Sequence, residues 1–164
     1  MLPLKWEELT PEDRATNENN FNEKSVLRDL VKYENGVVLP RLFAEKLADR
    51  IYDMELRDDD IWIVSYPKSG TTWAIETVWM VLNDVDIELG NSPQMSRCPF
   101  LESYAMIDHT SDDTRAKDDG MKELLDDPLA YADNMQGRRY FKSHLPFDFL
   151  PPKLFEICKV VCKF

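Results

Sequence analysis

An unbroken apolar run, residues 61–64 (Ile-Trp-Ile-Val), leads almost directly into residues 66–73, Tyr-Pro-Lys-Ser-Gly-Thr-Thr-Trp. The first segment is typical of a short strand buried on both faces, as in parallel sheets. The second predicts a tight loop followed by the start of a helix. Backbone N–H groups at a helix N-terminus lack intrahelical partners and carry partial positive charge, so they attract anions. This order of elements predicts a socket for a phosphate or sulfate group at the end of a strand.

The residue types in the loop suit the same ligand. Gly70 has no Cβ, so the backbone can approach an anion closely. Lys68 supplies a full positive charge, and Ser69, Thr71 and Thr72 supply hydroxyl donors. The common nucleotide-binding P-loop pattern, G-x-x-x-x-G-K-[ST], does not occur in the sequence. The loop is therefore a candidate anion site of a different type.

Strand and helix patterns alternate along the chain. Apolar residues at positions 43, 47, 51 and 54 recur at helical spacing after Pro40 and predict a helix that begins there. A helix over residues 72–83 is apolar on nearly all sides, so we expect it to be buried. Further strands are predicted at residues 139–143 and 157–161, with a short helix near residues 154–155. This alternation predicts an α/β fold with a parallel sheet covered on both faces.

Composition excludes several classes of function. The chain has 164 residues, which fits one domain, and its net charge is −11, from 20 basic and 31 acidic residues. Nucleic-acid binding needs clustered Lys and Arg, so we expect no nucleic-acid partner. No apolar stretch approaches the roughly 20 residues that span a bilayer, so we expect no membrane partner. The acidic N-terminus is unlike a secretory signal, and three sparse cysteines suggest reduced thiols; we therefore expect a cytoplasmic protein.

The sequence predicts two regions. Residues 1–24 are polar and are expected to form a mobile or loosely packed N-terminal arm, whereas residues 25–164 belong to a single domain. The acid-rich residues 108–133 are interpreted as a solvated loop and a surface helix. They lack the spacing of a calcium loop, so no metal site is expected. His109 lies in this stretch and is assigned no role.

A second cluster of candidate residues follows the predicted strand at residues 139–143. Ligands of open parallel sheets bind beyond the carboxyl ends of the strands, so Lys68, Lys142 and His144 should converge if the two strands are neighbours. A histidine with a pKa near 6.5 suits a general base, and lysines can neutralise charge on an anionic donor. The alternative is a solvated lysine and a structural loop histidine. From the residues alone, the prediction ends at an α/β phosphate- or sulfate-binding protein with a candidate base.

Residues 66–73 resemble the donor-binding signature of the cytosolic sulfotransferases. Three other segments resemble that family in the same order: residues 36–40 (Gly-Val-Val-Leu-Pro) before the first helix, residues 99–102 (Pro-Phe-Leu-Glu) on the substrate side, and residues 142–147 (Lys-Ser-His-Leu-Pro-Phe) around the catalytic histidine. The family usually has threonine where Ser143 stands, and the hydroxyl is kept. The resemblance extends from about residue 25 to residue 161.

The resemblance implies a P-loop-like, three-layer α/β/α sandwich that transfers a sulfuryl group from 3′-phosphoadenosine 5′-phosphosulfate (PAPS) to a hydroxyl or amine of a small acceptor, without a metal. It also implies site roles by position. His144 would be the base, Lys68 would stabilise the leaving oxygen, and Lys142 would stabilise the sulfuryl group. The 5′-phosphate would be held by Ser69, Gly70, Thr71, Thr72 and Trp73. Phe100 and Phe147 would line the acceptor pocket, although each could equally be an ordinary aromatic residue of the core.

The chain also departs from the family pattern. Family members are nearly twice as long, and their third strand continues into an aromatic residue and an arginine that binds the donor's 3′-phosphate. Here residues 162–164 are Cys-Lys-Phe. We therefore expect a truncated sulfotransferase that is weakly active or inactive, with a homodimer only in a full-length form. Two alternatives stay open: a non-catalytic relative that acts by interaction, and a kinase or NTPase with a variant phosphate loop.

Overall fold

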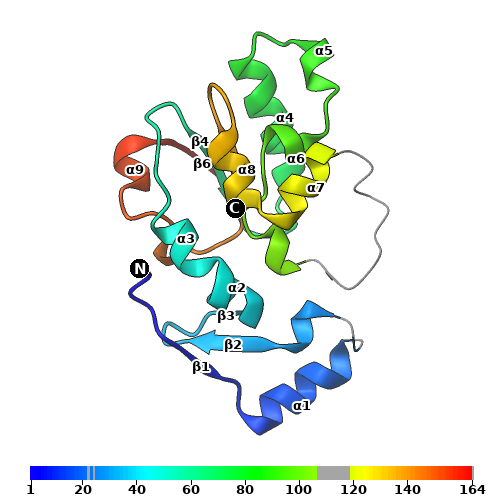
Figure 1. Ribbon diagram of the computed structural model, residues 1–164, viewed down its shortest axis with the longest axis vertical. Helices are drawn as coiled ribbons and strands as arrows, with labels where there is room; N and C mark the ends of the chain where they lie inside the picture. The colour runs from blue at the N-terminus through cyan, green and yellow to red at the C-terminus, as the bar shows by residue number, and fades with distance from the viewer. Residues whose placement is uncertain (22, 24, 107–118, 164) are drawn as a thin grey trace.

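The computed structural model describes residues 1–21, 23, 25–106 and 119–163 (Figure 1). His109 and the acidic residues Asp112, Asp113 and Asp118 therefore lie outside the described residues. Within the described ranges, no helix is long and apolar enough to cross a membrane.

The central element is a parallel sheet of three strands, as the sequence predicts. It consists of β4 (Ile61–Ser65), β5 (Tyr140–Ser143) and β6 (Lys159–Lys163), in the order β5-β4-β6. Ile61 lies opposite Tyr140 on one side and Lys159 on the other, so the three strands begin at the same level. Their carboxyl ends consequently meet at one edge of the sheet.

Side chains of β4 alternate between two hydrophobic clusters. Trp62 and Val64 pack in the cluster that contains residues of helices α2 (Arg41–Lys46) and α3 (Ala48–Tyr52). Ile61 and Ile63 pack on the other face with Ile75 and Trp79 of helix α4 (Thr71–Leu82). Because successive strand residues point to opposite faces, this apolar run needs helices on both sides. The structure therefore confirms the predicted α/β layering (Figure 1).

Helices α2, α3 and α4 differ in detail from the predictions. The apolar stripe at residues 43, 47, 51 and 54 is buried, but the helix is divided into α2 and α3 at Leu47. The prediction that the helix after the loop is buried on all sides is wrong. In α4 the buried residues are Thr71, Ile75 and Trp79, whereas Trp73 is 81% exposed and Val81 is 67% exposed. The sheet covers one side of α4, and Gln94 and Arg97 of helix α6 (Gln94–Arg97) bond to Glu76 on another.

A second, antiparallel sheet lies near the N-terminus and was not predicted. It consists of β1 (Trp6–Glu8), β2 (Leu30–Tyr33) and β3 (Val38–Pro40), with β2 in the middle. Residues 1–8 are therefore not a loosely packed arm, because Leu2 is buried and β1 pairs with β2. Helix α1 (Pro11–Asn20) has no buried residue.

The other elements are short. The acid-rich segment ends in two helices that bury Leu124, Leu129 and Ala132, so they contribute to the core as well as to the surface. The remaining elements are η1 (Val26–Arg28), α5 (Ile87–Gly90), α6 (Gln94–Arg97), η2 (Ser103–Met106), α7 (Asp119–Asp126), α8 (Pro128–Asn134), η3 (Phe147–Phe149) and α9 (Leu154–Ile157).

A buried ion pair joins the amino ends of two strands. Arg139, just before β5, donates to both carboxylate oxygens of Asp60, just before β4, at 2.8 and 2.6 Å. Asp60 is fully buried, and the side chain of Arg139 is 1% exposed. The arginine also donates to the backbone oxygen of Glu55 at 2.9 Å. A two-pronged contact of this kind fixes the relative position of the strands whose opposite ends carry the site.

Candidate functional site

The carboxyl ends of β4 and β5 place His144 against the last residue of β4. Nδ1 of His144 lies 2.7 Å from the backbone oxygen of Ser65 and 3.3 Å from its hydroxyl. A carbonyl oxygen can only accept a hydrogen bond, so we assign the proton of the neutral ring to Nδ1. Nε2 then carries the free lone pair. The structure thus fixes the orientation of the His144 ring against the strand that leads into the loop.

The electrostatic surroundings keep this imidazole neutral. Burial lowers the pKa of His144 below its usual 6.5, and the positive charge of Lys142 lowers it further, whereas the bond to Ser65 opposes the shift. The neutral form therefore predominates at pH 7, and a neutral imidazole is the form that can accept a proton.

The loop between β4 and α4 has an unusual backbone. Lys68 has a φ of +65° and Gly70 a φ of +92°, both in the left-handed region. The turn is closed by Ser69, whose N–H and hydroxyl donate to the backbone oxygen of Tyr66 at 3.3 and 2.7 Å. Gly70 is the N-cap of α4, and no side chain caps this helix. The first N–H groups of α4 therefore follow within three residues of the exposed Lys68, a sequence of groups suited to an anion.

The hydroxyls and the aromatic ring that follow Gly70 have different surroundings. Thr71 is buried, and its Oγ1 lies 2.6 Å from the hydroxyl of Ser65, so this side chain ties the helix to β4. Thr72 and Trp73 are exposed. Of the predicted loop residues, Lys68, Thr72 and Trp73 have side chains open to a ligand, whereas the side chain of Thr71 faces the interior.

Lys142 and Phe100 lie together beside His144. The ammonium nitrogen of Lys142 is 4.3 Å from the centre of the Phe100 ring, which meets the His144 ring edge to face at a centroid distance of 5.2 Å. Burial lowers the pKa of Lys142, and the carboxylate of Glu102 and the thiol of Cys98 oppose that shift. The structure thus brings three predicted residues into one group at the end of β5.

Two residues at this end of the sheet were not among the predicted site residues. One is Ser65, whose backbone oxygen orients His144. The other is Glu102, which is 1% exposed and accepts hydrogen bonds from Ser143 Oγ and from the backbone N–H groups of His144 and Leu145. Burial raises the pKa of Glu102 to about 7. Glu102 ends the segment 99–102 that resembles the family, but its residue type alone gave it no role in a chain with 31 acidic residues.

A mostly apolar groove opens next to His144. Its volume is about 530 Å³, and residues 37–39, 64–67 and 144–147 line it. Phe147 belongs to this wall, is 43% exposed, and packs edge to face on Phe155 at 4.9 Å. Phe100 is not among the lining residues and instead contacts His144 and Lys142 directly. The two predicted acceptor aromatics therefore occupy different places around the histidine.

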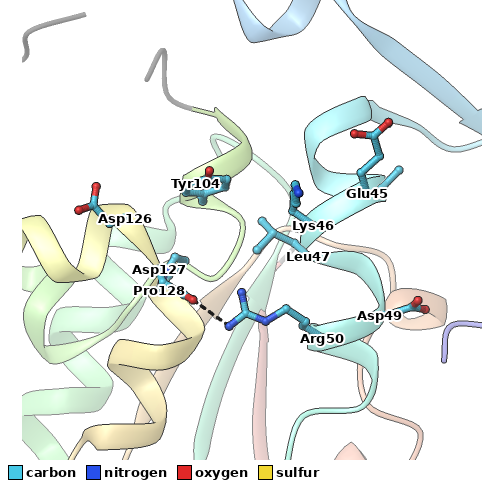
Figure 2. Close-up of a pocket in the computed structure, with 10 residues that line it drawn as sticks. Glu45, Lys46, Leu47, Asp49, Arg50, Tyr104, Asp126, Asp127 and Pro128 are labelled. Atoms are coloured by element: carbon cyan, nitrogen blue, oxygen red, sulfur yellow. Dashed lines mark hydrogen bonds and ion pairs between the residues drawn. The ribbon is translucent and has the colours of Figure 1, made fainter. Parts of the chain in front are cut away.

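A second pocket, of about 380 Å³, lies between α2–α3 and α7–α8 (Figure 2). Arg50 of α3 crosses it and donates to both carboxylate oxygens of Asp127 at 3.0 Å. None of the predicted site residues lines this pocket. Arg50 and Asp127 are already paired across it, so the candidate site remains at the ends of β4 and β5. No group of three or more His, Cys, Asp or Glu side chains suited to a metal occurs among the residues that the structure describes.

Comparison with known proteins identifies the family of the chain. Residues 58–163 match the family model described as "Sulfotransferase domain". Sulfotransferase 1A1 from Canis lupus familiaris is 35% identical over 130 residues, covering 79% of this chain and 38% of that protein. Sulfotransferase 1E1 from Homo sapiens is 32% identical over 129 residues, covering 77% and 38%. Luciferin sulfotransferase from Photinus pyralis is 31% identical over 109 residues, covering 66% and 29%.

The fold is similar to a solved structure as well. A crystal structure of retinol dehydratase in a complex with retinol and PAP superposes with a TM-score of 0.78 at 23% sequence identity, covering 98% of this chain and 51% of that one. The chain spans about a third of the length of the curated relatives that it matches. Since the family model covers well over half of the chain, this chain belongs to the sulfotransferase family.

Proposed function

We propose that this chain carries the donor loop and the catalytic base of a sulfotransferase that moves a sulfuryl group from PAPS to a hydroxyl or amine of a small acceptor. The observation that carries the proposal is the 2.7 Å contact between Nδ1 of His144 and the backbone oxygen of Ser65. Ser65 directly precedes the loop, so a neutral base and an anion-binding turn share one strand end.

The donor would bind through its 5′-phosphosulfate at the loop. The uncapped N-terminus of α4 and the two left-handed residues supply backbone N–H groups, and Lys68 supplies the countercharge. Ser69, Gly70, Thr71, Thr72 and Trp73 would surround the 5′-phosphate. The retinol dehydratase structures contain PAP, which is what remains of PAPS after sulfuryl transfer, and this supports a donor of that class.

The transfer step follows from the tautomer of His144. Nε2 would accept the proton of the acceptor hydroxyl, and the acceptor oxygen would form a bond to sulfur. The bond between sulfur and the bridging phosphate oxygen breaks, and PAP leaves with the electron pair. Lys68 would stabilise that leaving oxygen, and Lys142 would stabilise the negative charge on the sulfuryl oxygens. No metal is needed, because lysines and backbone dipoles carry the positive charge.

The acceptor would lie in the groove next to His144. Its apolar walls favour a hydrophobic body with one reactive hydroxyl or amine, and Phe147 would contact that body on one side. Phe100 does not line the groove and would support the acceptor site through its contact with the His144 ring. The solved structures of retinol dehydratase include retinol and androsterone, which supports a small-molecule acceptor. We also propose a cytoplasmic location, consistent with three cysteines that are all free.

The proposal is tested by calorimetric titration of the chain with PAP and with ATP, followed by transfer of radiolabelled sulfate from PAPS to a panel of phenols, steroids and alcohols. We expect saturable binding of PAP in preference to ATP, and slow transfer that is lost in His144→Asn. Hydrolysis of ATP with magnesium that is abolished by Lys68→Ala would support an NTPase instead. Failure of PAP to bind would overturn the proposal.

A further inference from the structure

We propose that Glu102 is a positioning residue for His144: its carboxylate holds the backbone turn from Ser143 to Leu145, from which the imidazole projects. The role of His144 as a base rests on the proposed function. The hold of Glu102 on the turn rests on geometry alone.

One carboxylate oxygen of Glu102 gathers the donors of this turn. Oε1 accepts from the hydroxyl of Ser143 at 2.8 Å, from the N–H of His144 at 2.8 Å and from the N–H of Leu145 at 3.1 Å. The hydroxyl of Ser143 in turn accepts from the N–H of Leu145 at 3.1 Å. Hydrogen bonds to a carboxylate are stronger than bonds between neutral groups, so this oxygen fixes three consecutive residues.

Glu102 is itself held against β5. The N–H of Lys142 donates to the backbone oxygen of Pro99 at 2.9 Å, and the N–H of Leu101 donates to the backbone oxygen of Lys142 at 3.3 Å. Phe100 thereby forms a parallel bridge with Lys142. The segment that carries Glu102 runs alongside β5 like a short additional strand, so the carboxylate has a fixed position relative to the turn.

The His144 ring is consequently fixed from two directions. Glu102 holds the backbone N–H of His144, and the backbone oxygen of Ser65 holds its Nδ1. Loss of the carboxylate would leave the N–H groups of His144 and Leu145 without this acceptor, in a buried place. The turn would then rearrange, and the ring would lose its alignment with the loop.

A purely structural role does not explain why residue 102 is a glutamate and not an apolar residue. A buried carboxylate is unfavourable unless its partners compensate, and an apolar residue would often stabilise a core equally well. The second oxygen, Oε2, is buried and has no hydrogen-bond partner within the described ranges. The negative charge also raises the pKa of the neighbouring Lys142. If Glu102 orients His144 beside Lys142, the buried carboxylate and its effect on the pKa of Lys142 both serve the site.

The test uses the imidazole signals of the chain, which has two histidines. Nitrogen-15 NMR of wild type, Glu102→Gln and Glu102→Ala, assigned with His144→Asn, reports the tautomer and the pKa of His144. We expect Glu102→Gln, which keeps an acceptor oxygen, to retain the Nδ1–H tautomer. We expect Glu102→Ala to lose the tautomer preference and to move the His144 pKa toward 6.5, the value of a free imidazole.

Ser103→Ala is the matched control, because Ser103 is the next residue, is 2% exposed, and has a hydroxyl without a partner within the described part of the chain. This variant should leave the His144 signals unchanged. A folded Glu102→Ala protein with wild-type His144 signals would overturn the proposal. In a full transfer assay, Glu102→Ala should lower kcat about tenfold or more with little change in KM, and Glu102→Gln should restore most of the rate.

A second measurement needs no variant and decides the matter if Glu102→Ala does not fold. The amide protons of His144 and Leu145 in the wild-type chain should exchange with solvent as slowly as those of β5, because the buried carboxylate of Glu102 accepts a hydrogen bond from each. Exchange of these two amides as fast as that of exposed loop amides would overturn the hold of Glu102 on the turn. Neither readout requires PAP or sulfate transfer, so failure of the proposed function would leave this result interpretable.

Discussion

Nδ1 of His144 donates to the backbone oxygen of Ser65 at 2.7 Å, and this bond joins the ends of two neighbouring parallel strands. The proton on Nδ1 leaves Nε2 as the basic nitrogen, and the Ser65 side of the bond leads directly into the loop of residues 66–70. A hydrogen bond within the protein holds the ring in one orientation, and a preorganised base is an advantage for catalysis.

The pKa of His144 provides a first prediction. Proton NMR titration of the imidazole should give a midpoint below 6.5, because burial and the positive charge of Lys142 both disfavour the charged ring. Lys142→Met should raise that midpoint. Since the folded-state pKa lies below the unfolded one, the contribution of this group to stability should be complete above pH 6.5 and should be lost as the pH falls. A midpoint above 6.5 in the wild-type chain would contradict the burial described above.

Lys68 should matter for the donor and not for the fold. Lys68→Ala should weaken calorimetric binding of PAP about tenfold or more, because one desolvated contact between a cation and a phosphate is worth at least ~1.4 kcal/mol. Lys159→Ala is the matched control. Lys159 is also exposed but begins β6 at the opposite end of the sheet, opposite Ile61. Equal losses in the two variants would indicate only a general charge effect.

Gly70 can be tested against a second glycine with a similar backbone. Gly70→Ala and Gly36→Ala both place a side chain at a positive φ, +92° and +85°, so each should lower the free energy of unfolding by about 1 kcal/mol. Neither site is crowded: the nearest atom to a Cβ at Gly70 is Lys163 Cε at 3.9 Å, and nothing lies within 4 Å at Gly36. Only Gly70→Ala should also weaken PAP binding. A loss of affinity in Gly36→Ala would show that backbone strain alone affects the site.

The buried ion pair between Asp60 and Arg139 should dominate the stability of the sheet. Arg139→Met leaves the fully buried Asp60 without its guanidinium partner, and removal of one partner of a buried pair lowers the free energy of unfolding by about 3–5 kcal/mol. Urea denaturation measures this loss. The double variant Asp60→Leu/Arg139→Met should recover part of it, because no unpaired charge remains. A loss below about 1 kcal/mol in Arg139→Met would show that water or other groups solvate Asp60.

The sequence predicts the parallel sheet well, because its signals are local. Residues 61–64 form an apolar run that needs two covered faces, and the positions of β5 and β6 follow from similar short runs. The antiparallel sheet depends on pairing between segments far apart in the chain. Residues 6–8 are exposed throughout β1 and show no alternation, so nothing local predicts that Trp6 lies opposite Tyr33. The exposed face of α4 was missed for a similar reason: the apolar composition of a helix does not show which of its faces other segments cover.

The sequence likewise predicts some residues of the site and misses others. The rule that ligands bind at the carboxyl ends of parallel strands anticipates that His144 and Lys142 approach the strand before the loop, and the structure places them there. Glu102 and Ser65 could not be found by that rule. Among 31 acidic residues a single glutamate is expected to be solvated, and only its burial and its three donors distinguish it. Ser65 acts through its backbone oxygen, and every residue type has a backbone oxygen, so the sequence does not single out this position.

The central claim is that one ligand occupies the loop while His144 stands beside it. It is tested most directly by titrating the chain with PAP while following the imidazole signals of His144 by NMR. We expect a saturable shift of those signals in wild type and its loss in Lys68→Ala, because a ligand at the loop would lie next to the ring that the Ser65 carbonyl orients. Saturable binding of PAP that leaves the His144 signals unmoved, or that persists unchanged in Lys68→Ala, would contradict it.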